Sequence, residues 1–136
     1  MSYLICKKID FCYGHRLMEY SGVCNRIHGH NATVEIVLES KTLNKIGMVE
    51  DFTTVKDVAK QFIEETFDHR LLLRYDDPLI ESLEQKNESY LEVIYNPTAE
   101  NISKHIFNFL SIHFKDILVA VRVHETNSSY AEFTRE

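Results

Sequence analysis

The sequence predicts an α+β fold in which a four-stranded antiparallel sheet carries two helices on one face. Residues 32–39 alternate apolar and polar side chains for most of their length, which is the pattern of a strand with one buried face. Two later segments place apolar residues three and four positions apart, which is the pattern of an amphipathic helix. Along the chain the order is two strands, a helix, a short strand, a helix and two strands, and this order predicts the α+β class.

The first half of the chain is expected to hold two strands and a helix. The first strand runs from Leu4 to His15, and a loop of about a dozen residues follows from Arg16 to Ile27. The helix begins near Asp51 or Thr53, because both are good N-caps, and it ends before Asp68. Its core face carries apolar residues at helical spacing: Val55, Val58, Ala59, Phe62 and Ile63.

The second half is expected to begin with a short strand at 89–95 and a helix with Pro97 near its first turn. The core face of that helix consists of Ile102, Ile106, Phe109 and Leu110. The last two strands, 117–126 and 130–134, are joined by a turn of Asn and Ser residues. One face of the sheet and its edges stay uncovered, so we expect the chain to oligomerise through the sheet.

Length and composition indicate one domain spanning residues 1–136. The net charge of −6 and the scattered basic residues argue against nucleic acid as the main partner. No apolar run approaches the ~20 residues of a membrane span, and residues 1–8 lack the pattern of a signal peptide. Three cysteines without a C-x-x-C motif fit a reducing cytoplasm. Two of them, Cys6 and Cys12, lie on the first strand and are expected to be small core hydrophobes.

Three histidines near the first loop predict a metal site. His28 and His30 are two residues apart, so on a strand both rings point to one face. If the strand ending near His15 pairs antiparallel with the strand starting near His28, the third ring joins them. Three histidines with a free fourth position are typical of catalytic zinc. The alternative, on these residues alone, is a half-buried polar pair at His28 and His30.

Other positions combine residue types that carry out chemistry. Cys24 lies in the loop, where a nearby zinc ion or charged imidazole would make it a thiolate base or nucleophile. Asp68 precedes His69, and a carboxylate there either orients the imidazole through a turn or leaves a solvated helix-end histidine. Glu125 is either a bidentate acceptor for a guanidine-like ring edge or a solvated strand-end carboxylate.

Six segments, in the same order along the chain, resemble motifs of the 6-pyruvoyl-tetrahydropterin synthase superfamily, and more closely those of its 6-carboxy-5,6,7,8-tetrahydropterin synthase branch. The branch assignment depends mainly on the three residues between Cys24 and His28. The chain departs from the usual motifs after Asp68-His69 and after Glu125-Thr126. The six segments are Phe11–Leu17, Cys24–Asn31, Gly47–Phe52, Asp68–Leu72, Pro97–Asn101 and Val123–Thr126.

The resemblance implies the tunnelling fold (T-fold), in which subunit sheets join into an oligomeric barrel. It implies a homohexamer, a dimer of trimers, with active sites between subunits. It also implies Zn²⁺ bound by His15, His28 and His30.

The remaining site residues also receive roles from the resemblance. It makes Cys24 the proton acceptor, and Asp68 and His69 a relay pair that belongs to another subunit. It makes Glu125 the anchor for a pterin ring, with Thr98 nearby. Arg16 and Arg26 are near enough to contact a triphosphate.

The activity that the resemblance implies is a zinc-dependent carbon–oxygen and carbon–carbon lyase. Such an enzyme converts 7,8-dihydroneopterin triphosphate to 6-carboxytetrahydropterin, acetaldehyde and triphosphate, for queuosine (7-deazaguanine) biosynthesis. One alternative is a 6-pyruvoyl-tetrahydropterin synthase or a folate-pathway pterin side-chain lyase. Another is a non-catalytic module that binds pterins or purines.

Overall fold

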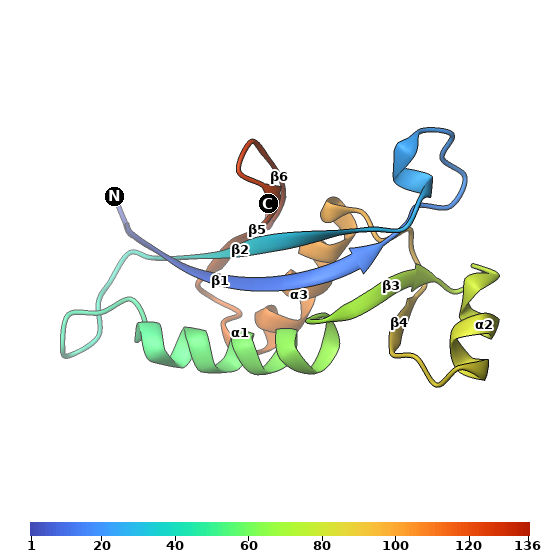
Figure 1. The fold of residues 1–136 in the computed structure, drawn as a ribbon. Helices are drawn as coiled ribbons and strands as arrows, with labels where there is room; N and C mark the ends of the chain where they lie inside the picture. The colour runs from blue at the N-terminus through green and yellow to red at the C-terminus, as the bar shows by residue number, and fades with distance from the viewer.

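A computed structural model describes all 136 residues. Six strands form one mixed sheet in the order β4-β3-β1-β2-β5-β6 (Figure 1). The strands are β1 (Tyr3–His15), β2 (His28–Ser40), β3 (Arg70–Arg74), β4 (Tyr90–Val93), β5 (Leu118–Thr126) and β6 (Ser129–Thr134). The helices are α1 (Phe52–Thr66), α2 (Leu79–Gln85) and α3 (Ala99–His113), and a 3₁₀ turn spans Val23–Asn25. None of these helices is both long enough and apolar enough to cross a membrane.

The α+β class is confirmed, and the sheet is larger than expected. Strands β1, β2, β5 and β6 form a contiguous antiparallel block, as predicted. Strands β3 and β4 extend this block in parallel from the free edge of β1, so the sheet has six strands and is mixed. Of these two added strands, only β4 falls in a segment expected to be a strand. The run Arg70–Arg74 is too short for its apolar residues to distinguish strand from helix.

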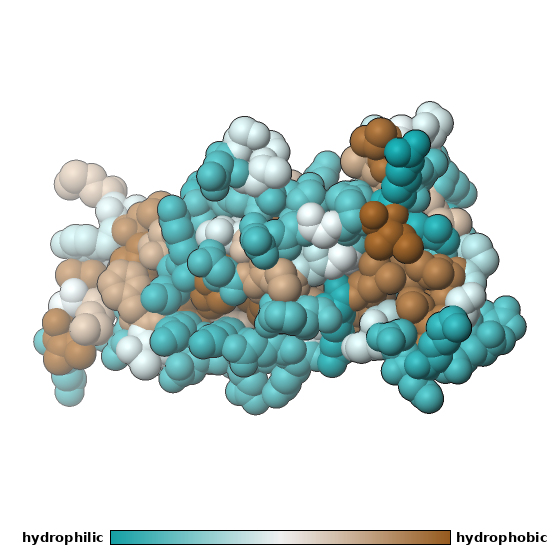
Figure 2. Space-filling model, viewed as in Figure 1, coloured by the Kyte–Doolittle hydropathy of each residue, from teal (hydrophilic) through white to brown (hydrophobic).

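Helices α1 and α3 pack on one face of the sheet, and α2 was not predicted. Odd positions of β1 and even positions of β2 point toward the two long helices. The core cluster joins Phe11, Val34, Ile63, Phe67 and Ile106, all of which are buried. Helix α2 buries a single residue at the sheet end, so it has no apolar stripe that a helical period would reveal. In Figure 2 the outward side of α1 is hydrophilic, whereas apolar side chains gather over β3, β4 and α2.

The expectation that Cys6 and Cys12 belong to the core is wrong. Both occupy even positions of β1, so their side chains point to the face without helices, and both are half-buried. The Cys6 thiol lies 3.8 Å from Glu35 Oε2. The two-residue period of the strand, rather than the apolar character of cysteine, decides which face they occupy.

Candidate metal centre and active site

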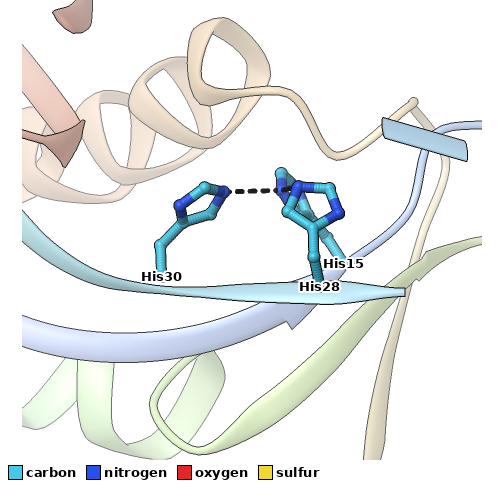
Figure 3. A group of neighbouring side chains, drawn as sticks. All are labelled: His15, His28 and His30. Atoms are coloured by element: carbon cyan, nitrogen blue, oxygen red, sulfur yellow. Dashed lines mark hydrogen bonds between the residues drawn. The ribbon is translucent and has the colours of Figure 1, made fainter. Parts of the chain in front are cut away.

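The β1–β2 hairpin brings the three predicted histidines together. His15 ends β1 and pairs with His28 at the start of β2, and Tyr13 pairs with His30 two positions further along. All three rings project from the same face of the hairpin, on the side where α3 lies (Figure 3). The Nε2 atom of His15 lies 3.0 Å from Nε2 of His28 and 3.2 Å from Nε2 of His30.

Backbone carbonyls orient two of the three rings. His15 Nδ1 lies 2.6 Å from the carbonyl oxygen of Pro97, and His28 Nδ1 lies 2.8 Å from that of Arg26. A carbonyl only accepts, so each Nδ1 carries the proton and each Nε2 presents a lone pair. Burial lowers the pKa of His15, which keeps that ring neutral near pH 7. Two lone pairs 3.0 Å apart repel each other unless a cation lies between them, so this donor set fits a divalent metal ion.

The carboxylate of Glu125 lies beside the histidine cluster, next to His15 and His30. Its Oε2 atom is 3.5 Å from Nε2 of His15 and 3.4 Å from Nε2 of His30. The same oxygen accepts a 2.8 Å hydrogen bond from the Tyr13 hydroxyl. Burial and the adjacent Glu125 raise the pKa of Tyr13, so the phenol stays protonated and donates. Glu125 is thus held beside the three imidazoles rather than being a solvated strand-end residue.

Tyr13 is a site residue that sequence reasoning missed. It is almost completely buried and packs edge-on against His15, with ring centroids 5.1 Å apart. The sequence contained the signal, because Tyr13 is two residues before His15 and therefore shares its strand face.

Three histidines with a carboxylate beside them are typical of a catalytic zinc centre, which keeps one coordination position open.

Asp68 and His69 form a paired unit in the turn between α1 and β3. Asp68 Oδ2 lies 2.9 Å from His69 Nδ1, and Asp68 Oδ1 accepts the backbone N–H of Cys12 at 3.0 Å. The expected turn geometry is present, since His69 has φ of 61°. The His69 side chain is 79 % exposed. Cys12 points to the face without helices, so this unit borders the side of the sheet opposite the three histidines.

Cys24 lies in the 3₁₀ turn of the loop between β1 and β2 and is half-buried. Its carbonyl accepts the N–H of Leu17 at 2.9 Å, which closes the loop upon itself. Within one chain, no hydrogen bond joins the Cys24 thiol to the histidine cluster or to Asp68-His69. The structure therefore brings His15, His28, His30 and Glu125 together, whereas it leaves Cys24 and the Asp68-His69 pair apart from that cluster.

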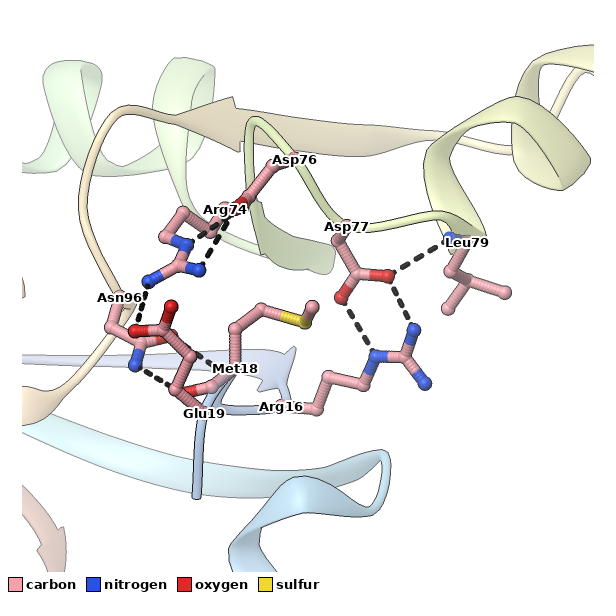
Figure 4. A network of polar contacts seen from close by, with 8 residues as sticks. All are labelled: Arg16, Met18, Glu19, Arg74, Asp76, Asp77, Leu79 and Asn96. Carbon is pink, nitrogen blue, oxygen red and sulfur yellow. Dashed lines mark hydrogen bonds and ion pairs between the residues drawn. The ribbon is translucent and has the colours of Figure 1, made fainter.

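The base of this loop is fixed by two polar contacts (Figure 4). The Asn96 side chain accepts the Met18 N–H at 2.8 Å and donates to the Met18 carbonyl at 2.7 Å. The Arg16 guanidinium forms a two-point ion pair with the buried carboxylate of Asp77, with Nε 2.7 Å from Oδ2. Arg16 thereby joins the loop to the turn before α2.

Thr98 is the N-cap of α3. Its hydroxyl accepts the N–H of Asn101 at 3.2 Å, and its neighbour Pro97 provides the carbonyl that holds His15. Thr98 thus lies one residue from the carbonyl that orients His15 in the histidine cluster.

Comparisons with known proteins agree with this architecture. The family model of 6-pyruvoyl tetrahydropterin synthase matches residues 4–136. A protein of Rickettsia conorii named 6-carboxy-5,6,7,8-tetrahydropterin synthase is 36% identical over 136 residues, covering 93% of this chain and 96% of its own. A crystal structure of an uncharacterized protein from Wolinella succinogenes has a TM-score of 0.88 at 28% identity, covering 100% of this chain and 99% of the other.

A more distant solved structure shares the fold. It is 6-pyruvoyl tetrahydropterin synthase of Caenorhabditis elegans, which has a TM-score of 0.74 at 22% identity and covers 100% of this chain and 97% of the other. The T-fold expected from the motifs is confirmed by these neighbours. The chain belongs to the 6-pyruvoyl tetrahydropterin synthase family.

Proposed function

We propose that this protein is a zinc-dependent 6-carboxy-5,6,7,8-tetrahydropterin synthase. The observation that carries the proposal is the convergence of three Nε2 atoms, two of them on rings oriented by backbone carbonyls, beside the Glu125 carboxylate. The relative from Rickettsia conorii has that name. The substrates are 7,8-dihydroneopterin triphosphate and one water molecule, and the products are 6-carboxytetrahydropterin, acetaldehyde and triphosphate. The pterin product feeds 7-deazaguanine (queuosine) synthesis.

His15, His28 and His30 hold the zinc ion. When bound there, zinc supplies Lewis-acid polarisation of the hydroxyl oxygens of the substrate side chain. Glu125 fixes the pterin ring: its Oε2 is taken by Tyr13, whereas Oε1 has no hydrogen-bond partner in the chain and is free to accept a ring N–H. A ring anchored at Glu125 directs the side chain of the substrate over the histidine cluster.

Proton transfer is assigned to Cys24, Asp68 and His69. Cys24 takes a proton from the substrate side chain, and His69 moves protons while Asp68 holds its tautomer through the 2.9 Å contact at Nδ1. One chain keeps the Asp68-His69 pair and the histidine cluster on opposite sides of the sheet. The pair therefore serves the histidine cluster of a neighbouring subunit. A complete site therefore needs at least two copies of the chain.

We propose a homohexamer for the assembly. The edge strands β4 and β6 are open, and the sheet face without helices is uncovered, which favours joining of sheets between subunits. The apolar side chains over β3, β4 and α2 (Figure 2) provide surface for the same contacts. The three free thiols fit a reducing cytoplasm, where we place the protein.

The experiment that tests the activity measures acetaldehyde release from 7,8-dihydroneopterin triphosphate by the zinc-loaded protein. We expect stoichiometric acetaldehyde with wild type and almost none with Cys24→Ala at equal zinc content. Cys6→Ala is the matched control, because Cys6 lies near the far end of β1 and should leave the release unchanged. Absence of acetaldehyde from zinc-loaded wild type would contradict the proposal.

A further inference from the structure

We propose that Cys12, Asp68 and His69 form a second metal site, separate from the three-histidine centre, for a borderline or soft divalent cation such as Zn²⁺, Co²⁺ or Cd²⁺. The Cys12 thiol, an Asp68 carboxylate oxygen and a His69 ring nitrogen all lie within 4.8 Å of one another. Two ligands bound to a tetrahedral zinc ion are themselves about 3.3–3.8 Å apart, so small side-chain movements suffice to enclose an ion.

The backbone holds these three groups together before any ion binds. Asp68 accepts the Cys12 N–H at 3.0 Å, and the His69 N–H donates to the Cys12 carbonyl at 2.8 Å, so β1 is bonded to both residues. His69 adopts left-handed backbone with φ of 61°, a conformation that is strained for a non-glycine residue. Although the His69 side chain is 79 % exposed, its Nδ1 atom lies 2.9 Å from Asp68 Oδ2.

The donor chemistry favours zinc-like ions over calcium or magnesium. A thiolate and an imidazole are poor ligands for hard cations, which prefer oxygen. Burial alone would raise the pKa of Asp68, but hydrogen bonds from the Cys12 N–H and from His69 lower it, so the carboxylate is already charged. Binding releases the thiol proton of Cys12 to solvent, and three protein ligands leave a position for water on the exposed side.

The surroundings leave room for an ion and its water. The face of the sheet beside Cys12 is hollowed and carries polar side chains from both hairpin strands, among them Asp10, Asn31 and Thr33. This hollow is on the opposite side of the hairpin from the rings of His15, His28 and His30. The two sites therefore share no ligand residue.

The regulatory consequence rests on the proposed function. An ion held by His69 engages the imidazole lone pair that proton transfer requires, so zinc beyond one equivalent per chain should inhibit turnover. The existence of the site does not depend on the reaction, and it is tested without substrate.

Cobalt titration of the metal-stripped full-length oligomer tests the site. The three-histidine centre supplies only nitrogen and oxygen ligands, so its cobalt complex lacks the near-ultraviolet thiolate-to-cobalt charge-transfer band. We expect this band to grow with a second equivalent of Co²⁺ in wild type, Cys24→Ala and Cys6→Ser, and to be absent in Cys12→Ser while the first equivalent still binds.

His69→Ala provides a second variant that should not disturb folding, because the side chain is largely exposed. We expect it to weaken binding of the second equivalent at least tenfold and to leave the first unchanged. His28→Ala should show the reverse, with the charge-transfer band retained. Binding of a single equivalent in wild type, or a band that survives Cys12→Ser and disappears in Cys24→Ala, would overturn the proposal and leave the proposed activity untouched.

Discussion

The Nδ1 atom of His15 lies 2.6 Å from the carbonyl oxygen of Pro97, so the turn before α3 determines which nitrogen of His15 faces the other two histidines. The same turn holds the loop between β1 and β2 through Asn96 and caps α3 through Thr98. Residues 96–98 thus connect the histidine cluster, the segment that carries Cys24 and the helix packed on the sheet.

Zinc content should depend on each of the three histidines. His28→Ala removes one of three imidazole ligands, and we expect purified protein to fall from about one zinc per chain to well below half. Metal analysis after desalting provides the measurement. His113→Ala is the control, because His113 is exposed at the end of α3 and should leave the zinc content unchanged. Full zinc occupancy in His28→Ala would exclude this centre.

Cys24 should affect turnover without affecting binding. Loss of a proton-transfer group typically lowers kcat by about 10²–10⁴-fold. For Cys24→Ala we therefore expect a fall in this range, with zinc content and pterin affinity unchanged, as measured by metal analysis and by titration with a pterin product. Loss of zinc in this variant would instead make Cys24 a metal ligand.

Asn96 should act as a positioning residue for the loop that carries Cys24. Asn96→Ala removes both hydrogen bonds to Met18, and a displacement of about 1 Å at a reacting group costs up to 10²-fold in rate. We expect kcat to fall while KM and zinc content stay near wild type, because neither the metal ligands nor Glu125 touches Asn96.

Asn96→Asp should retain an intermediate rate, because a carboxylate still accepts the Met18 N–H but has nothing to donate to the Met18 carbonyl. Asn108→Ala, on the exposed side of α3, is the matched control. Equal loss of rate in Asn96→Ala and Asn108→Ala would show that Asn96 has no specific role.

The Arg16–Asp77 ion pair should make stability depend on pH in acid. Burial opposes ionisation of Asp77, but the hydrogen bonds from Arg16 and from the Leu79 N–H outweigh it and lower the pKa of the carboxyl below its usual value. A depressed folded-state pKa contributes stability above the unfolded pKa of about 3.9, and this contribution is lost as the pH falls through the folded-state value.

Asp77→Asn tests this contribution by urea unfolding at pH 7 and pH 3. Removing one partner of a buried pair costs about 3 kcal/mol, so the variant should be less stable at pH 7. It should also lose less stability than wild type between the two pH values. Equal losses in both proteins would show that this pair is not a source of the acid sensitivity.

The sequence could predict the histidine cluster because the meeting of these side chains depends on two local rules. Positions two apart on a strand share a face, and a hairpin aligns the end of one strand with the start of the next, so His15, His28 and His30 had to meet. The same rules applied strictly would have placed Tyr13 in the site and Cys12 on the open face. The prediction for Cys12 is wrong because it follows the apolar character of cysteine rather than the two-residue period of the strand.

Other features depend on contacts that are distant in sequence. Strand β3 pairs in parallel with β1, and β4 pairs in parallel with β3; no turn motif in the sequence indicates either pairing. The contact of Glu125 with Tyr13 spans 112 positions. Likewise, the ion-pair partner of Arg16, Asp77, lies 61 positions away in the sequence. Local patterns carry no information about such pairs, so these contacts required the folded structure.

The most direct test of the central claim is the mass of the pterin formed when zinc-loaded protein consumes 7,8-dihydroneopterin triphosphate. We expect 6-carboxytetrahydropterin, with one acetaldehyde released for each triphosphate. A 6-pyruvoyl product would contradict the assigned reaction while retaining the metal centre and the ring anchor at Glu125. Unchanged substrate in the presence of one zinc per chain would contradict the proposed enzyme altogether.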